Sequence, residues 1–239
     1  MRTYLYKLTS DRGGAPCAPP ARRGRAPLLT LSICKPAIRR TAHPGDRILG
    51  LTSRALQASD GYPPASVIYA ATVDEVLPAR DYYAPRSAFR SRPDCIYEFD
   101  HALGDLRHTG RTALHADPAH LARDLGRYPY YRNGHILLCR DFRYFGPAAI
   151  AIPDRLPHLR HTAEALGQGH RVFTAGDDAA MDRELDAIFR ALRKLPTRHT
   201  PTQVQGDAYD HRSAGTCMPP AIPGNHFRGA LNPGAPPRC

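Results

Sequence analysis

Polar and apolar residues alternate at the start of the chain, and short apolar runs recur further along it. Alternation with a period of two is typical of a half-buried strand, so residues 3–9 are predicted to form one. Short apolar or β-branched runs bounded by turn residues predict further strands. These runs cover residues 28–34, 47–52, 66–77 and 135–139.

Helices are predicted where apolar residues lie three or four positions apart between capping residues. Residues 177–195 fit this pattern, with basic residues in the last turn and Pro196 as the stop. Asp117 and Pro118 form a capping pair that predicts a second, shorter helix. The shorter helical segments expected are 36–42, 78–83 and 118–125.

Short strands with a few helices between them indicate an α+β fold. We expect a small curved mixed sheet or half-open β-barrel, with short helices on its rim and one C-terminal helix. Residues 196–239 are rich in Pro, Gly, Thr and His and have no apolar period. We therefore expect one domain over residues 1–195, followed by a disordered tail over residues 196–239.

The composition excludes several classes of protein. The chain has 239 residues, 42% of them hydrophobic, which is enough to bury one core. No apolar run approaches the roughly 18 residues that span a bilayer, and the start resembles no secretory signal, so a cytoplasmic protein without a membrane partner is expected. The phosphate-binding loop and the dinucleotide fingerprint are both missing from the sequence. ATP, GTP and dinucleotide enzymes are therefore disfavoured, and no cofactor is predicted.

The net charge is +11, and it is concentrated at one end of the chain. Residues 1–60 carry 11 basic and 3 acidic residues, a net of +8, whereas residues 61–195 carry 18 and 17, a net of +1. An excess of this kind attracts an anionic partner such as a nucleic acid. The alternative is a solvated arginine-rich surface, since 30 of the 33 basic residues are arginine, as GC-rich coding favours.

Histidine and cysteine give no sequence signature of a metal site. His115 and His120 flank the predicted helix 118–125, and His158 and His161 are three residues apart. Neither pair has a cysteine or carboxylate at the spacing that would complete a site, so no metal is predicted. The six cysteines contain no Cys-x-x-Cys pair, and a disulfide framework is not expected.

Cys34 is the strongest candidate for a catalytic residue. It ends an apolar run just before the predicted helix at Pro36, where the helix dipole and Lys35 would favour a thiolate. A nucleophile also needs a positioned base, for which Asp11 and Asp141 are the candidates. The structural alternatives are a small buried apolar cysteine and aspartates that close turns.

Aromatic residues supply a second kind of candidate site. Tyr144 and Phe145 lie near a predicted strand end, and Tyr128, Tyr130 and Tyr131 precede a predicted strand. Such side chains either stack on nucleobases over a basic surface or pack in the core.

Six segments, in this order, resemble the family called nucleotide modification associated domain, type 2. They are residues 11–16 (DRGGAP), 31–42 (LSICKPAIRRTA), 44–50 (PGDRILG), 67–76 (VIYAATVDEV), 94–97 (DCIY) and 136–146 (ILLCRDFRYFG). The resemblance covers roughly residues 3–195. It implies an association with DNA base modification in phages and bacteria. The Gly45-Asp46 pair before a strand also resembles the PUA-like superfamily of small β-barrels that bind nucleic acids or modified bases.

The resemblance implies a nucleic acid or nucleotide as partner, and three functions follow from it and from the residues. The first is a module that recognises modified nucleotides, with phosphate contacts from Lys35, Arg39, Arg40 and Arg47 and a base pocket at Asp11, Cys34, Pro36 and Tyr144. The second is an enzyme that modifies a base or nucleotide with Cys34 as nucleophile. The third is an interaction module with no nucleic-acid role.

Overall fold

A computed structural model describes residues 1–21 and 26–198 of the chain. Its largest sheet has six strands, in the order β10-β4-β3-β1-β11, with β9 also paired to β4. β1 and β3 are parallel and the other pairs are antiparallel, so the sheet is mixed. The strands are β1 (Arg2–Leu8), β3 (Arg47–Thr52), β4 (Ser66–Thr72), β9 (Phe142–Tyr144), β10 (Ile150–Ala151) and β11 (His170–Thr174).

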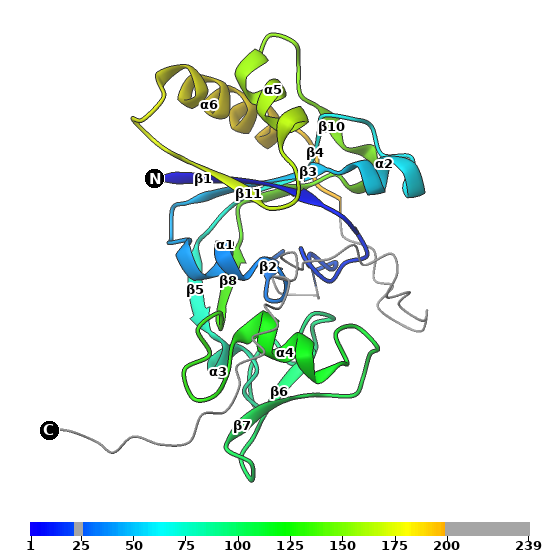
Figure 1. The fold of residues 1–239 in the computed structure, drawn as a ribbon, viewed down its shortest axis with the longest axis vertical. Coiled ribbons are helices and arrows are strands. Elements are labelled where there is room, and N and C mark those ends of the chain that lie inside the picture. Colours follow the sequence, from blue (N-terminus) through cyan, green and yellow to red (C-terminus); the bar gives the residue numbers. More distant parts are fainter. Residues whose placement is uncertain (22–25, 199–239) are drawn as a thin grey trace, which may run out of the picture.

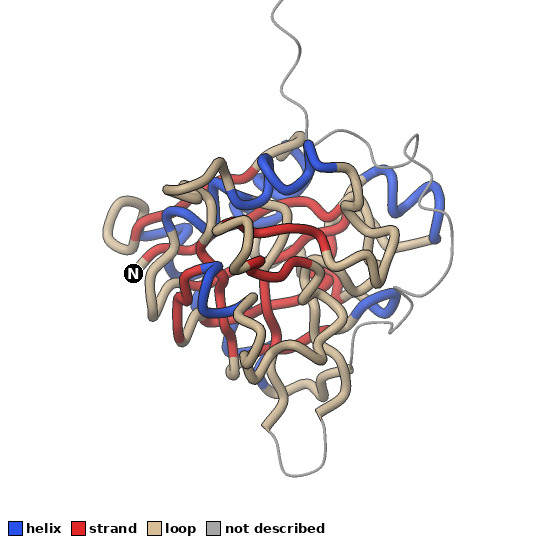
Figure 2. Tube along the Cα trace, turned by 90° about the horizontal axis from the view of Figure 1, so that it is seen from below, coloured by secondary structure: helices blue, strands red, loops and turns tan. Residues whose placement is uncertain are grey.

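Two smaller sheets and the helices surround this sheet. β2 (Leu29–Leu31), β8 (His135–Cys139) and β5 (Glu75–Pro78) form one, and β6 (Tyr97–Asp100) and β7 (Asp105–His108) form the other. The helices are α1 (Pro36–Thr41), α2 (Arg54–Asp60), α3 (Ala79–Tyr82), α4 (Pro118–Leu125), α5 (Pro157–Ala165) and α6 (Ala179–Arg193), with one 3-10 turn at Gly146–Ala148. Seen from below, the strands occupy the centre and most helices the periphery (Figure 2).

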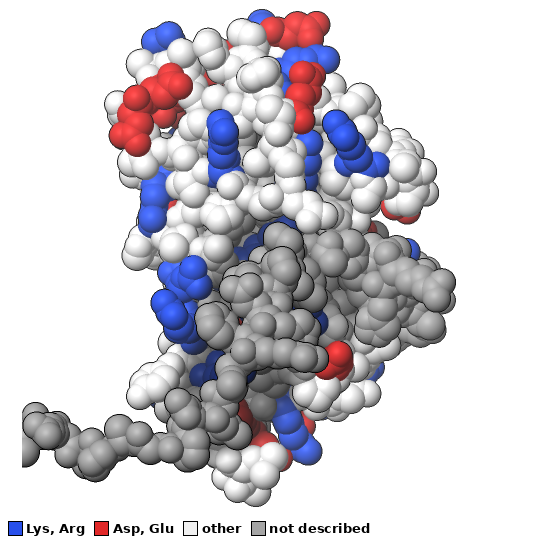
Figure 3. Space-filling view, in the orientation of Figure 1, with Lys and Arg blue, Asp and Glu red and all other residues white. Residues whose placement is uncertain are grey.

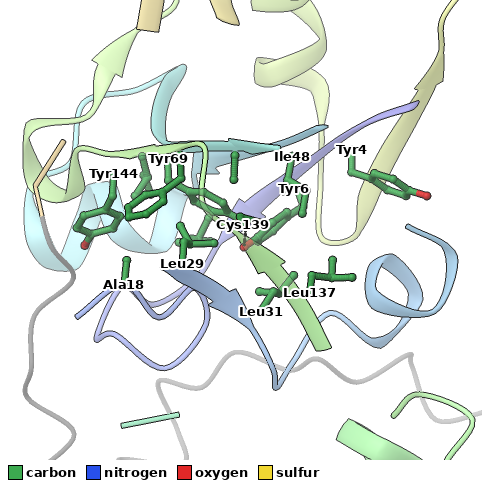
Figure 4. Close-up of a cluster of buried hydrophobic side chains, with 14 of the residues drawn as sticks. Tyr4, Tyr6, Ala18, Leu29, Leu31, Ile48, Tyr69, Leu137, Cys139 and Tyr144 are labelled. Atoms are coloured by element: carbon green, nitrogen blue, oxygen red, sulfur yellow. Dashed lines mark hydrogen bonds between the residues drawn. The ribbon is translucent and has the colours of Figure 1, made fainter. Parts of the chain in front are cut away.

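Alternation along β1 places apolar side chains on both faces of the large sheet. Leu5 packs on one face against α5 and α6, which cover the sheet in Figure 1. Tyr4, Tyr6 and Leu8 belong to the cluster on the opposite face, together with Leu29, Leu31 and Leu137 of the small sheet that contains β2 and β8. Figure 4 shows Tyr6 beside this sheet. Because both faces of β1 are buried, the strand lies in the middle of the molecule.

The predicted α+β class is confirmed. Among the described residues no sheet closes into a barrel, so the mixed sheet is the observed form. The long strand predicted over residues 66–77 is wrong in one respect, because it is two strands, β4 and β5. The Val73 N–H bonds the Asp46 carbonyl and the Asp74 N–H bonds the Leu138 carbonyl, so the chain crosses here from one sheet to the other.

The end of the described chain reaches into the predicted tail. The Thr197 hydroxyl accepts a 2.8 Å bond from the Tyr144 N–H, and the Arg198 N–H donates to the Tyr144 carbonyl at 2.7 Å. Residues 199–239, the remainder of that tail, lie outside the described residues. Within the described ranges, no helix has the length and apolar character needed to cross a membrane.

Candidate active site

Cys34 lies in a sharp turn between a strand and a helix. β2 ends at Leu31 and α1 begins at Pro36, and Cys34 and Lys35 take left-handed backbone conformations with φ of 55° and 43°. Residues with a Cβ rarely adopt this conformation, which costs about 1–3 kcal/mol and recurs at functional sites. A strand–turn–helix of this kind holds a nucleophile out of the regular backbone. The Cys34 side chain is half-buried.

His115 comes from a distant segment and lies against the Cys34 sulfur. Its Nε2 is 3.6 Å from Cys34 Sγ, within hydrogen-bonding range for a thiol. The His115 side chain is buried, and its backbone is also left-handed, with φ of 55°. The stacked ring of His120, with centroids 4.6 Å apart, lies beside it. The imidazole is therefore held in one orientation.

Asp124, in the last turn of α4, contacts the other nitrogen of the same ring. Its Oδ2 is 2.5 Å from His115 Nδ1 and accepts a bond from the Tyr97 hydroxyl at 3.0 Å. Its Oδ1 accepts the Cys34 N–H at 2.9 Å. Asp124 thus fixes both the imidazole and the backbone of the turn that carries the thiol.

The electrostatics keep this carboxylate charged. Burial by itself would raise the pKa of Asp124. The hydrogen bond and charge of His115, the Arg39 guanidinium and the Cys34 N–H outweigh burial and hold the pKa below its usual value. An ionised Asp124 accepts a hydrogen bond from the Nδ1–H of His115, so Nε2 of the neutral imidazole is left as the acceptor that faces the thiol. The order thiol, imidazole, carboxylate is that of a cysteine-protease-type triad.

The same three groups each offer one atom that could bind a metal ion. Their donor atoms lie within 4.8 Å of one another. However, Cys34 and Asp124 face opposite nitrogens of the His115 ring, and one ion binds only one of them. Asp124 also already accepts three hydrogen bonds. The geometry fits a proton relay better than a chelate.

Arg39 is not on the surface, contrary to its predicted role in binding phosphate. Its side chain is fully buried, and its guanidinium donates to four backbone carbonyls. These belong to Cys34 (2.7 Å), Asn133 (2.8 Å), His135 (2.8 Å) and Asp124. Arg39 therefore joins the turn of Cys34 to the end of α4 and to the chain entering β8.

The other predicted phosphate-binding residues do not form one surface. Lys35 Nζ lies 4.8 Å over the Tyr6 ring and donates to the Lys7 carbonyl. Arg40 is exposed and bonds Asn133. Arg47, the first residue of β3, forms a 2.6 Å ion pair with Asp186 of α6. On the face drawn in Figure 3, basic side chains lie at several separate places with acidic ones among them.

Asp11 contacts Tyr144, another residue of the predicted base pocket. Its Oδ2 accepts the hydroxyls of Tyr144 (2.7 Å) and Tyr62 (2.8 Å), and burial raises the pKa of Asp11. Tyr144 pairs across the sheet with Tyr69, whose hydroxyl bonds that of Tyr6 at 2.8 Å (Figure 4). Buried tyrosines thus separate Asp11 from the Cys34–Pro36 turn.

Asp141 belongs to another part of the molecule. Its carboxylate forms a 2.6 Å ion pair with Arg193 at the end of α6 and bonds Thr72. His115 and Asp124, which do contact Cys34 as a triad, were not predicted as its partners. No spacing in the sequence marks them, because 81 positions separate Cys34 from His115 and 90 separate it from Asp124.

Comparison with curated proteins and with solved structures gave no match. The family model for nucleotide modification associated domain 2 matches residues 1–206, which include every residue of the triad. The match covers most of the 239 residues and implies an association with nucleotide modification. The chain is therefore a member of the nucleotide modification associated domain 2 family.

Proposed function

We propose that this protein is an enzyme that transfers or removes an acyl group on a nucleotide, with Cys34 as the nucleophile. The observation that carries the proposal is the pair of contacts made by the His115 ring, from Nε2 to the Cys34 sulfur and from Nδ1 to the Asp124 carboxylate. A cysteine with an oriented imidazole is the standard apparatus for attack on a carbonyl carbon. The family supplies the substrate class, since its members are associated with nucleotide modification.

The proposed reaction has two halves. His115 Nε2 accepts the thiol proton as the Cys34 sulfur attacks the carbonyl carbon. A carbon–sulfur bond forms, the bond from that carbon to the leaving nitrogen or oxygen breaks, and the leaving group takes the proton from His115. Water or an amine then attacks the thioester and gives its proton to His115. The sulfur leaves and takes that proton back.

Asp124 is a positioning residue in this scheme. It holds the Nδ1 proton of His115 and offsets the positive charge that the imidazole carries between the two proton transfers. Its second oxygen holds the Cys34 N–H, so one carboxylate aligns base and nucleophile together. Arg40, on the helix that follows the turn, is exposed, and we assign it to the nucleotide phosphate.

Acylated nucleotides test this proposal. Deoxycytidine and deoxyadenosine monophosphates acetylated on the exocyclic amine are incubated with the protein, and products are followed by mass spectrometry. We expect release of acetate, an acetyl group on Cys34 in rapidly quenched samples, and a loss of turnover in Cys34→Ser of about 10³-fold or more. Cys95→Ala, at a buried thiol outside the triad, is the matched control.

Two results would contradict the proposal. One is turnover that survives in a folded Cys34→Ser variant. The other is wild-type protein that binds the nucleotides but forms neither product nor thioester. The second result favours the alternative function, a module that recognises modified nucleotides without changing them.

A further inference from the structure

A large groove is lined by α3, the β6–β7 hairpin and the loop before β8. Figure 1 shows α3, β6 and β7 at the lower end of the molecule. The volume of the groove is about 1090 Å³. One wall is α3 with the segment after it, a second is the β6–β7 hairpin, and the third is the loop between α4 and β8. None of the residues assigned to catalysis lines it, so it is a separate site.

The loop wall presents aromatic rings to solvent. Tyr130 is 86% exposed and Tyr128 is 58% exposed, and both line the groove with Phe99 and Tyr131. Exposed tyrosines lose hydrophobic stabilisation unless a partner covers them. Flat aromatic side chains on a groove wall are the platforms on which unpaired bases stack.

The loop that carries these rings is held in one shape. The Tyr131 hydroxyl donates to Asp105 and accepts the Leu106 N–H at 2.9 Å, which ties the loop to β7. A Cβ on Gly126 would lie 2.7 Å from the Arg132 nitrogen, and one on Gly134 2.9 Å from the Tyr131 carbonyl oxygen, so the loop closes tightly on itself. A preformed platform costs little conformational entropy on binding.

The groove is also lined by more basic than acidic groups. Arg80 and Arg86 are exposed on the helix wall, and His101 and His135 lie on the other two walls, against Asp81 as the acidic lining residue. Stacking rings beside guanidinium groups match the alternating bases and phosphates of a nucleic acid strand. A duplex hides its base faces, so the match is to a single strand.

One buried residue, Arg39, links the loop wall of the groove to the triad. The Arg39 guanidinium bonds the carbonyls of Cys34 and Asp124 on the triad side. It also bonds the carbonyls of Asn133 and His135, at the end of the loop wall. A strand seated on the loop is therefore held next to the turn of Cys34.

We propose that this groove binds a single-stranded polynucleotide by stacking bases on Tyr128 and Tyr130 and pairing phosphates with Arg80 and Arg86. Binding stands on the groove alone. The consequence that the substrate is a base within a strand, rather than a free nucleotide, rests on the proposed function.

The test is the anisotropy of a fluorescein-labelled oligothymidylate of about 12 nucleotides, titrated with full-length Cys34→Ser protein. Tyr130→Ala should weaken binding about tenfold, whereas Tyr130→Phe should keep it within about twofold. The double change Arg80→Ala and Arg86→Ala should lower the slope of log K against log salt by about 1.4. Arg155→Ala, an exposed arginine beside α5, is the charge-matched control.

Each outcome decides the matter. Tight binding of oligothymidylate that depends on Tyr130 supports the site. The same titration with labelled oligouridylate shows whether the groove prefers DNA or RNA. Absence of binding, binding equal in Tyr130→Ala and wild type, or full displacement by thymidine monophosphate overturns it. The binding assay uses Cys34→Ser protein, so it does not depend on catalysis. A negative binding result therefore leaves the proposed triad untested, and a negative turnover result leaves the binding result valid.

Discussion

At the scale of single residues, buried charge organises the site. Arg39 and Asp124 are both buried, and each makes several hydrogen bonds to the backbone or side chains around Cys34. A buried ion that is fully bonded is tolerated, but removal of its partners exposes a desolvation cost of several kcal/mol. Arg39 and Asp124 therefore hold the backbone around Cys34 in place as well as setting the local charge.

Substitution of Arg39 tests this directly. Lysine is a point charge with a single nitrogen and cannot reach four carbonyls together. We expect Arg39→Lys to lower the free energy of unfolding by about 3 kcal/mol, which is a fall in melting temperature of roughly 6–12 °C. The matched control is Arg40→Lys, at the exposed neighbouring position, which should melt within about 2 °C of wild type. Equal melting of the two variants would contradict the role given to Arg39.

The buried carboxyl of Asp11 should make the stability of the fold depend on pH with a sign opposite to that of most carboxylates. Burial raises its pKa in the folded protein above the unfolded value of 3.8, so the folded state binds more protons between the two values. Stability then falls as pH rises through this window. Urea unfolding of wild type and Asp11→Asn from pH 4 upward should show wild type losing stability relative to the variant. A constant difference, or one of opposite sign, would show that Asp11 is not penalised by burial.

At the scale of elements, a single turn residue fixes how two strands of the large sheet pair. Asp46 lies in the turn before β3, where its carboxylate accepts the N–H groups of Arg2 (2.7 Å) and His43 (3.0 Å) and pairs with the Arg2 guanidinium at 3.1 Å. It therefore fixes the start of β1 against the start of β3. A slip of one residue in that pair would turn Tyr6 to the wrong face of the sheet.

Asp46 is consequently a structural residue, and its variants should show it. Asp46→Ala should lower the free energy of unfolding by about 2 kcal/mol, or roughly 4–8 °C in melting temperature, because it removes several hydrogen bonds. Asp46→Asn keeps one acceptor and should lose about half as much. Both should retain the Cys34-dependent turnover. An Asp46→Asn variant of full stability but without turnover would assign the charge a catalytic role.

Local patterns predicted the elements whose signals are local. The strand 47–52 and the helix 118–125 occur where the short apolar run and the Asp117–Pro118 cap placed them. α2 and α5 were missed, because α2 buries only Leu56 and α5 buries only Leu159, Thr162 and Ala163, which gives no clear apolar period in the sequence. The triad was out of reach for a different reason. Its members meet only because tertiary packing brings α4 against the turn after β2, and no pattern within a window reports that contact.

At the scale of the whole molecule, backbone contacts continue past residue 195, where the domain was predicted to end. Thr197 and Arg198 bond both backbone groups of Tyr144, whose hydroxyl bonds Asp11. Truncation after Pro196 should therefore cost about 1–2 kcal/mol, whereas truncation after Arg198 keeps both bonds. Thermal melting of the two truncated proteins measures the difference. If both melt together, the contacts to Tyr144 contribute nothing to stability.

The central claim, that His115 activates Cys34, is tested most directly by the alkylation rate of Cys34 with iodoacetamide near neutral pH, resolved by peptide mass spectrometry. Cys95 is an internal reference, since burial raises the pKa of its thiol to about 11. Cys34 should react about tenfold or more faster in wild type than in His115→Ala, while Cys95 stays slow in both. Equal Cys34 rates in the two folded proteins would contradict the claim.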